Sequence, residues 1–260
     1  MNRSPGTRVA LRSIPLLGLF QALACTADRP VGPFGTRDSD TRTNRQLTVA
    51  LDSDQPDERR KALLSLIYEP AARSPEAYQA LDLIARTDQN DAVRRAAIAV
   101  LAQYEDDRPA ETLLRLLHAE DHRTTVRPVN DAIRWDAVTA LGGLAERGVI
   151  PAARWPEVVR TLTTLLYDSA DHHVQVSAAR ALRHFFCRES ITALAGALSA
   201  RDFGVAYEAR ASLRYMTGLQ EDMGSAAWQE WLYQANVPPA SSLHADEQAY
   251  TTADQAGGPQ

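Results

Sequence analysis

The sequence predicts an all-α solenoid of about five antiparallel helix pairs that ends in a C-terminal capping helix. Three observations predict it: a similar eleven-residue segment recurs along the chain, its apolar residues follow the spacing of one helix face, and no stretch alternates apolar and polar residues over strand length. The chain has 260 residues, of which 45% are hydrophobic and 23% charged, with only 2 Cys. This composition is globular and excludes a wholly disordered chain and a disulfide framework.

Residues 1–24 are expected to be a targeting signal that is removed from the mature chain. Three arginines and no acidic residue accompany an apolar stretch over 13–24, which is too short for a membrane-spanning helix. The stretch ends in Ala22-Leu23-Ala24-Cys25, which satisfies the A-x-A rule of ordinary signal peptidase. It also resembles a bacterial lipobox, although Leu is usual where Ala22 stands. Both alternatives cut before Cys25, which is then either lipidated or merely the first mature residue.

Residues 25–44 are expected to form a flexible tether, because they are polar, contain Pro and Gly, and lack periodicity. Removal of the signal takes away three Arg and no acid, so 25 basic and 33 acidic residues remain and the net charge falls from −5 to −8. That charge argues against a nucleic-acid partner. With a lipidated Cys25 followed by Thr26, we expect an outer-membrane lipoprotein on the periplasmic side. Without the lipid we expect a periplasmic or secreted protein, and a start codon assigned too early would instead leave a cytosolic one.

The second helix of each pair is predicted from the recurring segment. Each copy keeps apolar or small residues at the positions equivalent to Val93, Ala97, Val100 and Leu101, which share one helix face. Arg59 is a misfit in the first copy, as an outermost repeat would show. The five copies read DERRKALLSLI (57–67), DAVRRAAIAVL (91–101), DAIRWDAVTAL (131–141), HHVQVSAARAL (172–182) and FGVAYEARASL (203–213).

The first helices are predicted between these copies, and three of them have Pro at or near the start, where a missing N–H costs little. They cover 45–51, 75–86, 109–119, 156–168 and 190–199. The solenoid is therefore expected over 45–235. In its last helix, Trp228 and Trp231 are three residues apart and share a face that would cover the core of the fifth pair. Residues 236–260 lack a helical stripe and are expected to be a disordered tail.

The second-helix pattern D-x-V-R-x-x-A-x-x-x-L resembles HEAT repeats, in the bacterial subclass also called phycobilisome-lyase HEAT-like repeats. The closing segments LRYMTG (213–218) and AAWQEWL (226–232) resemble the end of bacterial envelope HEAT-repeat proteins. The resemblance implies the fold and says little about function. It also implies that Asp and Arg residues form a structural ladder between adjacent repeats, here Asp57, Asp91 and Asp131 with Arg60, Arg94 and Arg134. The three Asp are expected to cap the free N–H groups of their helices.

One row of residues stands opposite the apolar stripe and is the candidate binding site. Position 95 lies on the far side of its helix from Val93 and Ala97, at about 100° per residue. Because second helices line the concave surface of such solenoids, we expect this row to form a partner-binding groove. It is rich in Trp, Tyr and Arg, which dominate the energetics of interfaces. The alternative is a solvated face with incidental aromatics. The row comprises Lys61, Tyr68, Arg95, Trp135, Val176, Arg183, Tyr207 and Arg214.

Signals for catalysis or metal binding are weak. His118 and His122 have a metal-type spacing, but a solvated helix end is the simpler interpretation, and His172-His173 fit a helix entry. No phosphate-binding glycine loop or nucleophile-elbow motif is present. Cys187, flanked by Phe185 and Phe186, is expected to be a buried, inert thiol. We therefore expect no catalytic residue, metal or cofactor.

These observations favour a monomeric, non-catalytic scaffold of the bacterial cell envelope that binds a protein or peptide along its second helices. A bilin-lyase-type enzyme is the alternative, because such lyases share the repeat, but the signal segment argues against it. A nucleic-acid-binding HEAT-like module is a further alternative, and export and negative charge argue against it.

Overall fold

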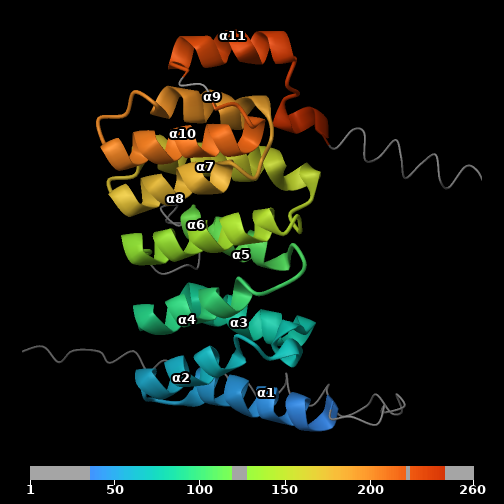
Figure 1. The fold of residues 1–260 in the computed structure, drawn as a ribbon. Coiled ribbons are helices and arrows are strands. Elements are labelled where there is room, and N and C mark those ends of the chain that lie inside the picture. Colours follow the sequence, from blue (N-terminus) through green and yellow to red (C-terminus); the bar gives the residue numbers. More distant parts are fainter. Residues whose placement is uncertain (1–35, 119–127, 221–222, 244–260) are drawn as a thin grey trace, which may run out of the picture. The chain divides into compact units, whose positions relative to one another are not determined.

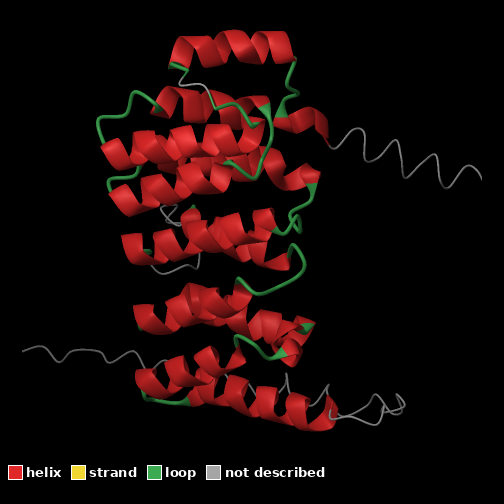
Figure 2. Cartoon of the chain, viewed as in Figure 1, coloured by secondary structure: helices red, strands yellow, loops and turns green. Residues whose placement is uncertain are grey.

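The structure is a computed structural model, and it describes residues 36–118, 128–220 and 223–243. The contacts divide the chain into two units, residues 1–37 and 38–260, and the second unit contains the helical body. The expected signal, Cys25 and the first part of the expected tether lie outside the described residues. Within the described ranges every regular element is a helix (Figure 2).

The predicted all-α solenoid is confirmed: the helices form antiparallel pairs, and the pairs stack on one another (Figure 1). Short 3₁₀ turns at Pro70–Arg73, Ala152–Arg154 and Ala240–Ser242 supplement them. The five pairs of the described residues are α1 (Thr36–Asp52) with α2 (Pro56–Leu66), α3 (Pro75–Thr87) with α4 (Asp91–Leu101), α5 (Arg108–Leu117) with α6 (Asp131–Glu146), α7 (Trp155–Asp168) with α8 (His172–Leu182), and α9 (Arg188–Ala197) with α10 (Phe203–Thr217).

The pairs form two layers. The second helices α2, α4, α6, α8 and α10 pack on one another in series, and α3, α5, α7 and α9 do the same in the other layer. The single helix α11 (Ser225–Ala235) packs on α9 at the end of that second series. We call the outward side of the first series the second-helix face. Among the described residues, no helix combines the length and the apolar character needed to cross a membrane.

Helix starts are set by caps that lie one position before the aspartates expected in that role. The side chain of Asn90 accepts hydrogen bonds from the N–H groups of Ala92 and Val93, and Asn130 accepts one from Ile133. Asp91 and Asp131 are thus the first residues of their helices rather than the caps. They lie in the first turn, where a negative charge favours the helix dipole. Further along the chain Asp171 and Asp202 cap α8 and α10, whereas Gln55 before α2 makes no side-chain cap.

The apolar stripe of the repeat forms a continuous core between the two layers. Val93, Ala97, Val100 and Leu101 are all buried, and so are their equivalents in the following pairs. Small residues let the second helices approach closely. At Gly142 in α6, an added Cβ would lie only 3.2 Å from the Cβ of Ala181 in α8. The close packing of α6 on α8 therefore requires glycine, which has no side chain, at position 142.

Both ends of the solenoid extend further than the repeat pattern predicts. Helix α1 begins at Thr36, inside the expected tether. After α11 the chain returns to the body: Val237 and Ala240 are buried, and the N–H of Arg188 donates to the carbonyl of Pro238 at 3.0 Å. Residues 236–243 are thus part of the folded unit, although the sequence pattern assigns them to the tail. The side chain of Trp228 in α11 is buried. The ring of Trp231 lies edge-on to it, with 5.6 Å between the ring centroids.

Candidate functional site

The predicted row lies on the second-helix face. Each second helix, or the turn that follows it, contributes one or two residues to the row. Its aromatic members are exposed to different extents: 40% for Trp135, 62% for Tyr207 and 86% for Tyr68. Lys61 is also exposed, whereas Val176, Arg183 and Arg214 are half-buried. The helices turn these side chains outward because the caps fix the start of each helix and the apolar stripe fixes its buried side.

A groove of about 680 Å³ crosses the second-helix face over α2, α4 and α6. From α4 and the turn after it, Ala92, Arg95, Ala99 and Ala102 line the groove. Leu64 and Tyr68 line it from the α2 side. Side chains from three consecutive pairs therefore shape this surface together.

Polar side chains on α4 and α6 border this groove. Arg95 donates through Nε and Nη2 to the carboxylate of Asp136, which ties α4 to α6. This hydrogen bonding raises the pKa of the Arg95 guanidinium. Arg147 lines the groove and donates through Nη2 to the carbonyls of Ala102 (2.6 Å) and Tyr104 (3.2 Å). Because both acceptors are carbonyl groups, these two bonds do not neutralise the charge of Arg147.

A second group of side chains gathers on the same face over α8 and α10. The Arg183 guanidinium stacks on the ring of Tyr215, 4.8 Å from its centroid, and its Nε donates to His184 Nε2. Burial and the charge of Arg183 lower the pKa of His184. Arg180 holds the buried carboxylate of Glu208 with two hydrogen bonds of 3.0 and 2.8 Å.

Arg214 lies beside this group with an unsatisfied donor. Its Nε is buried and has no hydrogen-bond partner among the described residues. The row predicted from the sequence contains Arg183 and Arg214 but misses Tyr215, His184 and Arg180. Each of these lies one to four residues from a predicted position, so a wider strip of the helical projection would have included them.

Among the described residues, each Asp of the expected ladder forms an ion pair with the Arg three residues later in the same helix. Arg60 lies 3.8 Å from Asp57, and Arg134 lies 3.1 Å from Asp131. Arg94 is fully buried: it lies 3.5 Å from Asp91 and donates to the carbonyl of Ala85 at 3.0 Å and that of Pro128 at 2.9 Å.

Arg94 therefore joins the end of α3 to the chain entering α6. The side chain of Asn130 adds a second link between these pairs, because it donates to Asp91 at 2.6 Å. In this part of the ladder, backbone carbonyls and an amide connect adjacent pairs.

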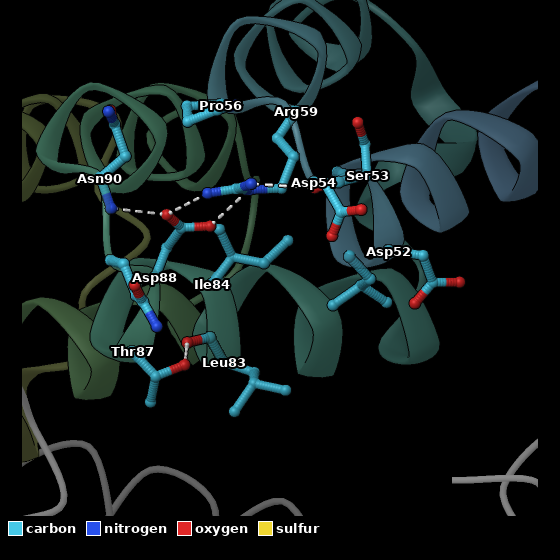
Figure 3. Close-up of a pocket in the computed structure, with 13 residues that line it drawn as sticks. Asp52, Ser53, Asp54, Pro56, Arg59, Leu83, Ile84, Thr87, Asp88 and Asn90 are labelled. Atoms are coloured by element: carbon cyan, nitrogen blue, oxygen red, sulfur yellow. Dashed lines mark hydrogen bonds and ion pairs between the residues drawn. The ribbon is translucent and has the colours of Figure 1, made fainter.

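Arg59, the misfit of the first copy, proves to be a connecting residue. It points inward at the ends of α1, α2 and α3, in a pocket of about 600 Å³ (Figure 3). Its guanidinium donates to both oxygens of Asp88 at 2.9 Å and to the carbonyl of Ser53 at 2.9 Å. The pKa of Arg59 is raised, chiefly by hydrogen bonding to Asp88. We interpret this pocket as a polar joint between pairs, since its central charges already satisfy one another.

The remaining candidates for chemistry have structural partners. His118 Nε2 and Thr161 Oγ1 are 2.7 Å apart, and His172 Nδ1 lies 2.8 Å from Asp202. His122 lies outside the described residues. Within the described ranges, no three His, Cys, Asp or Glu side chains are grouped to hold a metal ion. Cys187 is buried with Sγ 3.2 Å from Ser190 Oγ, and burial raises the pKa of its thiol, as expected of an inert cysteine.

Comparison with known proteins adds little about the site. No protein-family model matches the chain, and no curated protein matches it. Among solved structures, the chain is similar to a designed armadillo repeat protein. The two are 17% identical, the match covers 68% of this chain and 99% of the designed one, and the TM-score is 0.29. Such a likeness carries no argument about binding, so the paired and stacked helices are themselves the basis for the solenoid assignment.

Proposed function

We propose that this protein is a non-catalytic scaffold that binds a protein or peptide along its second-helix face. The observation that carries the proposal is the set of exposed aromatic and arginine side chains on that face, beside a groove that crosses three helices. Aromatic and arginine side chains are enriched among the residues that dominate binding energy. Stacked helices also hold these side chains at fixed spacings, so a partner would meet a surface that needs little ordering.

The proposal includes a cellular address. Its basis is the signal-like segment before Cys25 and the HEAT-like repeat pattern, which resembles that of bacterial envelope proteins. In this proposal Cys25 carries a lipid that holds the chain at the periplasmic side of the outer membrane. Metabolic labelling with an alkyne fatty acid tests it: the full-length chain is expected to incorporate label, and Cys25→Ala is expected to abolish it. Unlabelled wild-type protein would overturn the lipid anchor and leave the binding face untouched.

Crosslinking of the tagged full-length chain in envelope membranes, followed by mass spectrometry of crosslinked peptides, tests the scaffold. We expect a reproducible protein partner whose crosslinks fall on α4, α6, α8 and α10. The double variant Trp135→Ala and Tyr207→Ala is expected to lose that partner. Tyr233 on α11 is 85% exposed but is not in the second-helix row, so Tyr233→Ala is the matched control. A partner that is retained by the double variant would remove the assignment of the face.

A further inference from the structure

The groove over α2, α4 and α6 has features that specify the chemistry of its occupant. Much of its lining is apolar: Leu64 and Tyr68 line it from the α2 side, Ala99 and Ala102 from the α4 side and Ala140 from α6. Leu64 is 40% exposed there, so the trough can take up large apolar side chains from a partner. An exposed apolar trough is the usual form of a surface that receives side chains from a partner.

The charges around the trough are predominantly positive. Arg60, Arg95 and Arg147 line it, and Lys61 follows Arg60 on α2. Among the lining residues Asp136 is the one acid, and Arg95 already neutralises it. Arg60 pairs with Asp57 at 3.8 Å, and the side chain of Asp57 is 85% exposed. In a chain whose formal net charge is −5, this local excess of positive charge is unusual and complements an anionic partner.

We propose that the trough binds an acidic, amphipathic peptide segment of a partner protein, whose large apolar side chains lie over Ala99 and Ala102 and whose carboxylates face Lys61, Arg60 and Arg147. This inference rests on the proposed function and adds the chemistry of the bound segment. The apolar floor gives affinity, and the positive border selects against basic segments, because like charges at an interface are costly.

Selection from a phage library of random 12-residue peptides against the purified full-length chain tests the inference directly. We expect enriched peptides to combine Leu, Ile or Phe with an excess of Asp and Glu. Their binding is expected to fall at least about tenfold in Ala99→Trp, which fills the trough, and in Ala99→Glu, which adds a negative charge to it. Because Ala99 points outward, both variants should keep the thermal unfolding midpoint of the wild type.

Matched variants separate the trough from the rest of the surface. Ala226→Trp places the same side chain on the exposed side of α11 and is expected to leave peptide binding unchanged. Lys61→Gln is expected to weaken binding of the acidic peptides several-fold, and the effect should shrink as salt is raised. Arg160→Gln, an exposed position on α7, removes the same charge outside the trough and should have no effect.

The outcomes also distinguish this inference from the proposed function. Enriched peptides without an acidic excess, peptides insensitive to both Ala99 variants, or no enriched peptide would each overturn the acidic segment. If an envelope partner is still lost in the Trp135→Ala and Tyr207→Ala variant, the scaffold stands and the chemistry assigned to its partner is wrong. If the partner is also insensitive to that double variant, both proposals fail.

Discussion

At the scale of single residues, Arg94 is the side chain on which the stack depends most. Its guanidinium is wholly buried and satisfies carbonyl groups at Ala85 and Pro128. Replacing it with Met would keep much of the volume but leave those acceptors without their donors, and burial of an unsatisfied polar group costs about 1–3 kcal/mol each. We therefore expect Arg94→Met to lower the free energy of unfolding by about 3 kcal/mol in urea titrations.

Arg60 provides the matched control, because it occupies the equivalent position of the preceding pair. Its side chain is 41% exposed and lies 3.8 Å from Asp57, which is 85% exposed. Exposed ion pairs contribute little, so Arg60→Met should cost less than about 1 kcal/mol. Equal losses in the two variants would show that the buried carbonyl contacts of Arg94 are not the source of its effect.

At the scale of helices, the adjacent glycines of α6 are expected to respond in opposite ways. Gly142 faces α8, and a Cβ there would meet Ala181, so Gly142→Val should force the helices apart and cost about 1–3 kcal/mol. Gly143 faces outward, where the nearest atom to an added Cβ is Arg147 Nη1 at 3.5 Å. Gly143→Ala should therefore stabilise α6 by about 0.5–1 kcal/mol through helix propensity. The thermal unfolding midpoints of both variants test this prediction. A lower midpoint for Gly143→Ala would contradict the faces assigned to the two glycines.

The segment after α11 is expected to contribute to stability. A chain that ends at Ala235 loses the burial of Val237 and Ala240 and the contacts of 237–240 with Arg188 and Glu189. We expect it to be less stable than the full chain by about 2 kcal/mol in urea titrations. A chain that ends at Leu243 should match the full chain. If both truncations were neutral, residues 236–243 would have no stabilising role.

Most of the helices could be predicted from the sequence, and the surface only in part. The periodicity at Val93 and its equivalents set α4, α6, α8 and α10 to within a few residues, because burial of one stripe repeats in every pair. The link from Arg59 to Asp88 spans 29 residues and depends on how two pairs meet, and no local pattern encodes that. The groove escapes prediction for a related reason: side chains from three consecutive pairs line it, and the pattern of a single repeat does not show how they meet.

At the scale of the whole molecule, the described unit is a one-dimensional stack in which each pair contacts mainly its neighbours. The stability of such a stack is the sum of the intrinsic stability of each pair and the stabilisation from the contacts between neighbouring pairs. The end pairs have one neighbour fewer. Hydrogen exchange followed by mass spectrometry should therefore find the slowest amides in α6 and α8 and faster ones in α2 and α11. Equal protection along the chain would indicate that the unit opens as one body.

The contacts between neighbouring pairs differ from one junction to the next. Arg59 binds Asp88 at one junction, Tyr78 shares a hydrogen bond with Thr112 at another, and Arg180 holds Glu208 at a third. Similar repeats invite recombination within a gene, which deletes or duplicates one unit. Here such an event would bring together halves of unlike junctions and leave a buried charge or hydroxyl without its complement. The order of the repeats is thereby fixed. A form of this protein with one repeat more or fewer would need new residues at the altered junction before it could fold.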